Sequence, residues 1–125
     1  MKQIIIADPR KENIMNIMIM LEKDYVIFPA RSAAWMLKVL KQKDIDLVIM
    51  NIDMGGGNRA PGLMKKIRSS YRYKDLPFIV ASTDTSADIG NARECISMGK
   101  CEAMVIPIDK REIVSAVEDM LHSNT

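Results

Sequence analysis

The chain has 125 residues, with 18 Lys and Arg against 16 Asp and Glu and a formal net charge of +2. This length predicts one domain over residues 1–125, and a composition of 48% hydrophobic and 27% charged residues excludes a disordered chain. The small net charge gives no electrostatic reason to expect binding to nucleic acid or to an anionic membrane.

Targeting segments and the common catalytic groups are missing from the sequence. No stretch approaches the roughly 20 apolar residues of a membrane span. The first apolar run is short and is followed by Asp8, unlike a signal peptide, so we expect a soluble cytoplasmic protein. The one histidine, His122, leaves no Ser-His-Asp or Cys-His system and no histidine metal cluster. Cys95 and Cys101 lack CxxC spacing, which predicts two reduced, packed thiols.

The first part of the chain predicts two strand–helix units. Ile4–Ala7 is a short β-branched run typical of a buried strand, and apolar residues recur at helical spacing over Glu12–Leu21. Tyr25–Phe28 predicts a second strand that ends at Pro29. Ser32 can cap the next helix. The apolar side of that helix is formed by Ala33, Met36, Leu37 and Leu40.

The second part predicts three further units. Leu47–Met50 is a third apolar run, followed by a glycine-rich loop over 55–58 and a helix from Leu63 to Arg68. Phe78–Ala81 predicts the fourth strand. The remaining elements are a helix over 86–98 with Ile89, Ala92, Arg93 and Ile96 on one side, a strand over Ala103–Ile106, and a helix capped by Asp109 with Ile113, Val114, Val117, Met120 and Leu121 inward.

Five strand–helix units predict an α/β fold with a doubly wound parallel sheet. Continuous apolar strands indicate burial on both faces, so helices must cover both sides of the sheet. Ligands of such sheets bind beyond the carboxyl ends of the strands. The places to inspect are therefore Asp8-Pro9, Asn51–Met54, Ser82-Thr83 and Ile106-Pro107.

At these strand ends the chain resembles a response-regulator receiver domain of two-component, or phosphorelay, signalling. The resemblance extends from Ile4 to about Leu121. It implies a flavodoxin-like (βα)5 sandwich with strand order 2-1-3-4-5. The matching stretches are Ile4–Asp8, Asp46–Asn51 with Met54, Leu76–Ser82, and Met98-Gly99 leading to Ile106-Pro107.

The resemblance also implies a phosphorylation chemistry, for which this sequence lacks most of the side chains. In the family an aspartate ending the third strand accepts the phosphoryl group, two acids after the first strand hold Mg²⁺, and a lysine follows the fifth strand. Here Asn51 holds the acceptor position, Pro9 that of the second acid, Ile106 that of the lysine, and Ala103 that of the aromatic switch residue. The pocket residues that match the family are Asp8, Ser82 and, at its cis-proline position, Pro107.

This pattern predicts a degenerate receiver, or pseudo-receiver, that is not an enzyme. An amide is a poor nucleophile, so we expect no ordinary phosphorylation at Asn51. Such a domain would work through protein contacts with a signalling partner, namely a histidine kinase, an output domain or another receiver. The resemblance places output and dimer contacts, including a homodimer, on residues about 86–118, and we expect no direct contact with nucleic acid or membrane.

Two alternatives concern small ligands at the same edge of the sheet. Asp8 and Asp53 can be read as a weak Mg²⁺ site, or Asp53 can simply shape a glycine-rich turn; we expect no resident cofactor. A small-ligand, nucleotide or flavin-type binding module is the other reading, because Asn51, Ser82 and the loop of residues 55–60 (GGGNRA) offer amide and hydroxyl groups.

Two groups of surface residues are open to more than one reading. Met15, Ile19, Met20 and Trp35 fall outside the predicted buried helix faces, which suits either an interface or ordinary surface exposure. A basic group after the glycine loop suits either a solvated helix face or docking to an acidic partner. It consists of Lys65, Lys66, Arg68, Arg72 and Lys74.

Overall fold

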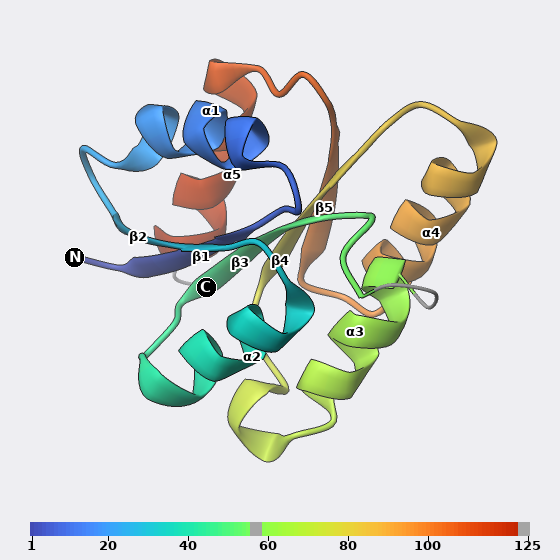
Figure 1. Cartoon of the computed structure of the whole chain (residues 1–125), viewed down its shortest axis with the longest axis horizontal. Helices are drawn as coiled ribbons and strands as arrows, with labels where there is room; N and C mark the ends of the chain where they lie inside the picture. Colours follow the sequence, from blue (N-terminus) through green and yellow to red (C-terminus); the bar gives the residue numbers. More distant parts are fainter. Residues whose placement is uncertain (56–58, 123–125) are drawn as a thin grey trace.

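The computed structural model describes residues 1–55 and 59–122, which form one parallel sheet covered by helices on both faces (Figure 1). The strand order is β2-β1-β3-β4-β5, and all four strand pairings are parallel. This confirms the predicted flavodoxin-like architecture. None of the helices in the described part of the chain is long and apolar enough to cross a membrane.

The five strands overlap the five apolar runs of the sequence, although the fifth begins at Cys101, before the predicted Ala103, and ends before Ile106. In β1, β3 and β4 nearly every residue is buried, because helices cover both faces of the central strands. β2 and β5 are the edges of the sheet and are more exposed. The strands are β1 (Gln3–Ala7), β2 (Val26–Ala30), β3 (Leu47–Asn51), β4 (Phe78–Ser82) and β5 (Cys101–Val105).

The helices divide into two layers, as Figure 1 shows. α1 and α5 cover one face of the sheet, while α2, α3 and α4 cover the other. Successive strand residues alternate between the two cores: Val48 and Met50 join the α2–α4 side, whereas Leu47 and Ile49 join the α1–α5 side. The helices are α1 (Lys11–Leu21), α2 (Ala33–Gln42), α3 (Arg59–Arg68), α4 (Ser86–Ser97), α5 (Lys110–His122) and the short 3₁₀ helix η2 (Tyr71–Tyr73).

Side-chain caps fix the starts of three helices. The Ser32 hydroxyl accepts a hydrogen bond from the Trp35 backbone N–H at 3.1 Å, and the Asp109 carboxylate accepts one from Glu112 N–H at 3.1 Å. Both caps confirm the sequence prediction. Thr85 supplies a third cap, for α4. Each cap satisfies one of the backbone donors that a helix start leaves unpaired.

Two further details of the sequence prediction are wrong. Pro29 lies inside β2 instead of ending it, because β2 is an edge strand and a proline there need not donate to a second neighbour. The α4 stripe is also misplaced: the helix buries Ala92 and Cys95, while Ile89 and Ile96 remain 38% and 44% exposed.

Arg68 belongs to the basic group that suits either a solvated helix face or docking to an acidic partner, but in the structure its side chain joins three segments. Its guanidinium donates to the carbonyl of Leu76 at 2.8 and 3.2 Å and to that of Met98 at 2.9 Å. It also donates to Gly99 O at 2.6 Å and Lys100 O at 3.0 Å. These carbonyls lie before β4 and at the turn between α4 and β5. Arg68 therefore fixes the amino ends of two strands to α3.

Arg68→Ala should lower the free energy of unfolding by about 2–4 kcal/mol, because it leaves several partly buried carbonyls without their charged donor. Urea unfolding followed by circular dichroism measures this change. Lys66→Ala, an exposed neighbour on the same helix, is the matched control and should change stability by less than about 0.5 kcal/mol. Equal effects of the two substitutions would contradict the role of Arg68.

The two thiols should be unreactive in the folded protein. Both are free and buried, and burial raises the pKa of Cys95 to about 11 and that of Cys101 to about 12. A thiol-specific reagent at pH 8 should label both only after unfolding, since the thiolate is the nucleophile. Because the folded pKa values are raised, the thiols' contribution to stability is complete below about pH 8.5 and is lost as pH rises toward 11–12. Rapid labelling of either thiol in the native protein would contradict the prediction that both are unreactive.

Candidate functional site

Three buried polar residues meet at the carboxyl end of the sheet. Asp8 directly follows β1, Asn51 ends β3 and Ser82 ends β4, and their exposed fractions are 2%, 3% and 3%. Adjacent strand ends bring these residues together although they are far apart in the sequence. Asn51 and Ser82 also line a cavity of about 330 Å³, together with Ile106, which follows β5. The structure thus brings together the pocket residues that the sequence analysis placed at the strand ends.

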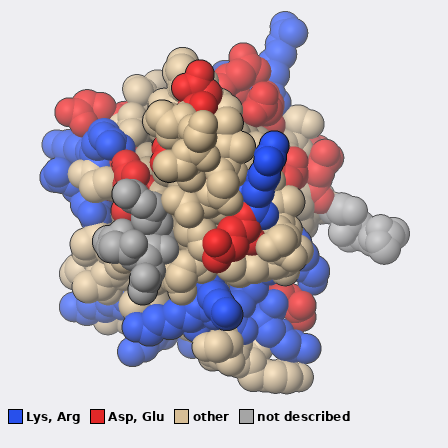
Figure 2. Space-filling model, turned by 90° about the vertical axis from the view of Figure 1, so that its right-hand side faces the viewer, with Lys and Arg blue, Asp and Glu red and all other residues tan. Residues whose placement is uncertain are grey.

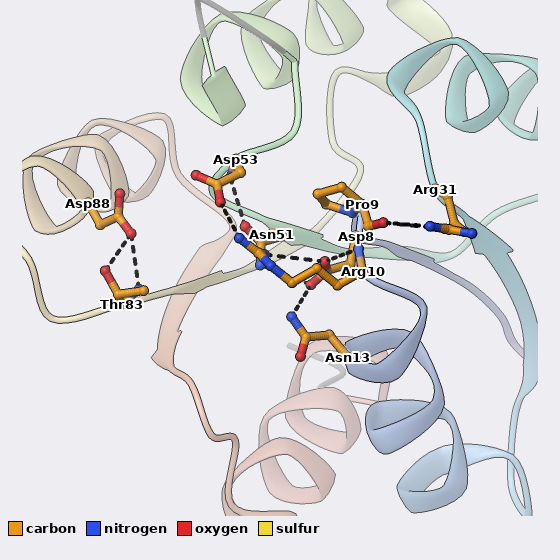
Figure 3. Close-up of polar contacts among 9 residues, drawn as sticks. All are labelled: Asp8, Pro9, Arg10, Asn13, Arg31, Asn51, Asp53, Thr83 and Asp88. Carbon is orange, nitrogen blue, oxygen red and sulfur yellow. Dashed lines mark hydrogen bonds and ion pairs between the residues drawn. The ribbon is translucent and has the colours of Figure 1, made fainter.

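The Asp8 carboxylate is surrounded by nitrogen donors (Figure 3). Its Oδ2 accepts hydrogen bonds from Asn51 Nδ2 at 2.9 Å and from Asn13 Nδ2 at 3.0 Å. Its Oδ1 accepts one from the Arg10 backbone N–H at 2.8 Å. Asn51 therefore acts as a donor to the neighbouring acid. An aspartate at position 51 would instead place a second carboxylate there.

Arg10 spans the two acids that the sequence analysis considered as a weak cation site. Its Nη1 lies 3.7 Å from Asp8 Oδ1, and its Nη2 lies 3.1 Å from Asp53 Oδ2. Asp53 is also fixed through its backbone, whose N–H donates to Asn51 Oδ1 at 2.8 Å. Figure 3 shows the Arg10 side chain extending from beside Asp8 toward Asp53.

This donor set does not fit the divalent cation that the family implies. A hard cation needs several free oxygen ligands, whereas the Asp8 oxygens already accept from N–H groups and Arg10 lies between the two acids. No group of three or more His, Cys, Asp or Glu side chains that could hold a metal occurs within residues 1–55 and 59–122. The cationic group of this site is a guanidinium that belongs to the chain.

The remaining predicted positions surround the site without contributing charge. Pro9 is exposed, and its carbonyl accepts from Arg31 Nη2 at 3.2 Å. The Ile106–Pro107 peptide bond is cis, and Ile106 places a hydrocarbon side chain at the cavity wall. Ala103 lies in β5, half-buried against the α2–α4 side of the core.

The loop between β4 and α4 is held by contacts that the sequence analysis missed. Thr83 donates to Asp88 Oδ2 from its hydroxyl at 2.6 Å and from its backbone N–H at 3.2 Å. The Thr85 hydroxyl lies 3.2 Å from that of Thr83 and also caps α4. A segment rich in Ser and Thr with an acid a few residues later is the local signal that could have predicted these side-chain contacts.

Arg10 and Asn13 were also missed, for a different reason. Asn13 lies in the first turn of α1, so its distance from Asp8 follows from how the chain leaves β1 and enters the helix. The Arg10–Asp53 pair joins residues 43 positions apart, and no local pattern relates them. The one local signal was the position of Arg10 directly after Asp8 and Pro9, where a basic side chain could take the place of a metal ion.

The structure shows which of the apolar and basic side chains noted in the sequence lie at the surface. Trp35, Met15 and Ile19 are exposed, as predicted, while Met20 is half-buried. Figure 2 shows Lys and Arg side chains gathered along the lower part of the face that carries α3 and α4. The glycine-loop reading falls largely on residues 56–58, outside the described residues, so the nucleotide or flavin alternative stays a prediction.

Comparison with protein families and curated proteins points to one family. The family model of the response regulator receiver domain matches residues 4–118. The chain is 34% identical over 91 residues to the two-component response regulator-like protein PRR73 of Oryza sativa, in subspecies indica and in japonica. That match covers 71% of this chain and 12% of each rice protein, so the chain spans about an eighth of the length of these relatives.

Solved structures share the fold at low sequence identity. A response regulator receiver domain protein from Clostridium thermocellum gives a TM-score of 0.86 at 18% identity and covers 98% of this chain and 96% of its own. The chemotaxis response regulator CheY4 of Vibrio cholerae gives 0.83 at 18% identity, with 97% and 99% covered. The receiver domain of an HD domain-containing protein from Pseudomonas fluorescens Pf-5 gives 0.84 at 22% identity, with 98% and 88% covered. Because the family model spans most of its length, the chain belongs to the response regulator receiver domain family.

Proposed function

We propose that this receiver domain takes part in two-component signalling without being phosphorylated in the usual way, and that it acts through protein–protein contacts. The observation that carries the proposal is the hydrogen bond of 2.9 Å from Asn51 Nδ2 to Asp8 Oδ2. It makes the residue at the acceptor position a donor that holds the neighbouring acid. The same residue cannot act as the nucleophile toward a phosphoryl group.

The chemistry of the other positions supports the same proposal. Pro9 offers no carboxylate for a metal, and Ile106 offers no ammonium group for phosphoryl oxygens. Arg10 lies where a bound cation would neutralise Asp8 and Asp53. We infer that the guanidinium takes over this neutralising role permanently, so that the domain keeps one electrostatic state with or without Mg²⁺.

An apolar surface on the edge of the sheet supports action through contacts. Ile89 and Ile96 on α4 and Val105 on β5 are exposed, and Val105 is 53% exposed. They lie within the 86–118 segment, which we propose as the face for a histidine kinase, an output domain, another receiver or a second copy. On the face that carries α4, Figure 2 shows an area of uncharged side chains bordered by charged ones of both signs, which suits such a contact.

Treatment with a small phosphodonor and Mg²⁺ should leave the mass of the intact protein unchanged, because the Asn51 amide does not form an acyl phosphate. Intact mass spectrometry gives the readout, and a receiver domain with an aspartate acceptor, treated in parallel, is the positive control. A stoichiometric phosphate adduct on Asp8 or Asp53 would overturn the proposal.

Asn51→Asp should lower the free energy of unfolding by about 1–3 kcal/mol, because it replaces an amide donor with a carboxylate facing Asp8. Millimolar Mg²⁺ should restore part of this loss in the variant and leave the wild type unchanged. Urea unfolding with and without Mg²⁺ measures both effects.

The matched control is Asn16→Asp, the same chemical change on the exposed face of α1. It should change stability by less than about 0.5 kcal/mol and show no response to Mg²⁺. Stabilisation of the wild type by Mg²⁺ would contradict the neutralising role assigned to Arg10.

A further inference from the structure

A second hollow of about 700 Å³ lies away from the strand ends, between α1 and α2 beside the edge strand β2. In Figure 1 β2 forms one border of the sheet, with α1 on one face and α2 on the other. Apolar side chains of Met15, Met18, Pro29 and Trp35 form most of its lining. We call this hollow the β2-edge groove.

Two apolar side chains of the β2-edge groove, those of Met15 and Trp35, are exposed and lie outside the core, whereas Met18 packs partly against it. Trp35 is 51% exposed, and α2 buries a different side, formed by Met36, Val39 and Leu40. Met15 is 47% exposed, although α1 already buries Ile14 and Ile17 against the sheet. A half-exposed tryptophan beside an exposed methionine provides large, adaptable apolar area for a partner.

Every charged residue in the lining of the groove is a cation. These are Lys11 at the start of α1 and Arg31 after β2. The Lys38 ammonium lies 4.9 Å from the centre of the Trp35 ring. The segment from residue 31 to residue 43 also carries Lys41 and Lys43 and contains no acid. The groove therefore combines an apolar lining with a cationic surround formed by Lys11, Arg31 and Lys38.

This combination favours one occupant over two others. A second copy placed symmetrically would bring each cationic surround against itself, because a two-fold interface pairs a patch with the same patch. Nucleic acid binding would draw on the cations but leave the Met15, Met18 and Pro29 surface unused, since phosphates need donors rather than hydrocarbon. An amphipathic helix with acidic residues beside its apolar face satisfies both the lining and the charge.

We propose that the β2-edge groove binds an acidic amphipathic helical segment of a partner protein. The proposal rests on the function proposed above, action through protein contacts, and assigns it a surface and a partner chemistry. It concerns a surface separate from the 86–118 segment, so one domain can engage two partners at once.

Trp35 is the only tryptophan of the chain, so its emission reports on the groove directly. The probe is a capped synthetic peptide of about 15 residues, with leucines at helical spacing on one face and Asp and Glu elsewhere. Titration of the whole chain should produce a saturable blue shift of Trp35 emission, weakened by added salt. A peptide of the same composition, reordered so that its leucines share no face, should produce none.

Two substitutions locate the binding. Met15→Asp and Lys11→Glu should each raise the dissociation constant by about tenfold or more, because one removes apolar contact and the other reverses a charge. The matched controls are Ile96→Asp, at a residue of similar exposure on α4, and Lys66→Glu on α3. Both controls should stay within about twofold of the wild type, and circular dichroism should show all four variants folded.

Three outcomes would overturn the groove proposal. These are no saturable shift, equal affinity for the reordered peptide, and unchanged affinity in Met15→Asp. A single-stranded oligonucleotide that shifts Trp35 emission at lower concentration than the peptide would assign the groove to nucleic acid instead. If any of these results is obtained while phosphodonor treatment leaves the protein mass unchanged, the groove proposal is wrong and the proposed function is unaffected. A phosphate adduct would instead contradict the proposed function itself.

Discussion

The buried carboxylate of Asp8 is the constraint on which the site depends. A charged oxygen pair that is only 2% exposed is costly unless nitrogen donors replace the water it has lost. Three different parts of the chain provide them: the Arg10 backbone, the Asn13 amide in α1 and the Asn51 amide at the end of β3. Asn51 Oδ1 in turn accepts a hydrogen bond from the Asp53 backbone N–H, so the same Asn51 side chain also positions the turn after β3. The identity of residue 51 is thus tied to the burial of residue 8.

The scaffold around this site is maintained by interactions that need no phosphorylation chemistry. The central strands place alternate residues into two helix-covered cores, which fixes the register of the sheet. Arg68 adds a polar clamp at the opposite end, where it gathers carbonyls before β4 and β5. The fold of the family is therefore complete in a chain whose pocket holds Asn51, Pro9 and Ile106.

In the function proposed for this domain, surfaces replace the chemical switch. Asn51, Ile106 and Ala103 differ from the residues that the family resemblance implies, while Ser82 matches, and Ala103 has no ring to reorient. What the molecule presents instead is apolar area in two places: Ile89, Ile96 and Val105 along α4 and β5, and Trp35 with its neighbours in the β2-edge groove. The first carries charges of both signs, with Arg93 and Glu94 between the two isoleucines and Glu102 in β5, whereas the charged residues lining the second are both cations. The two surfaces therefore suit partners of different chemistry.

The sequence by itself determined what depends on neighbours along the chain. Apolar runs located every strand approximately, and Ser32 and Asp109 identified two helix starts. The strand–helix pattern placed Asp8, Asn51 and Ser82 at one edge of the sheet. The tertiary structure decided what depends on distant neighbours. Arg10 and Asp53 are 43 positions apart, and Arg68 donates to carbonyls 30 or more positions away. The orientation of α4 on the sheet buries Ala92 rather than Ile89. Periodicity predicts that a helix has an apolar side, but its packing against the sheet determines which side is buried and which charges meet.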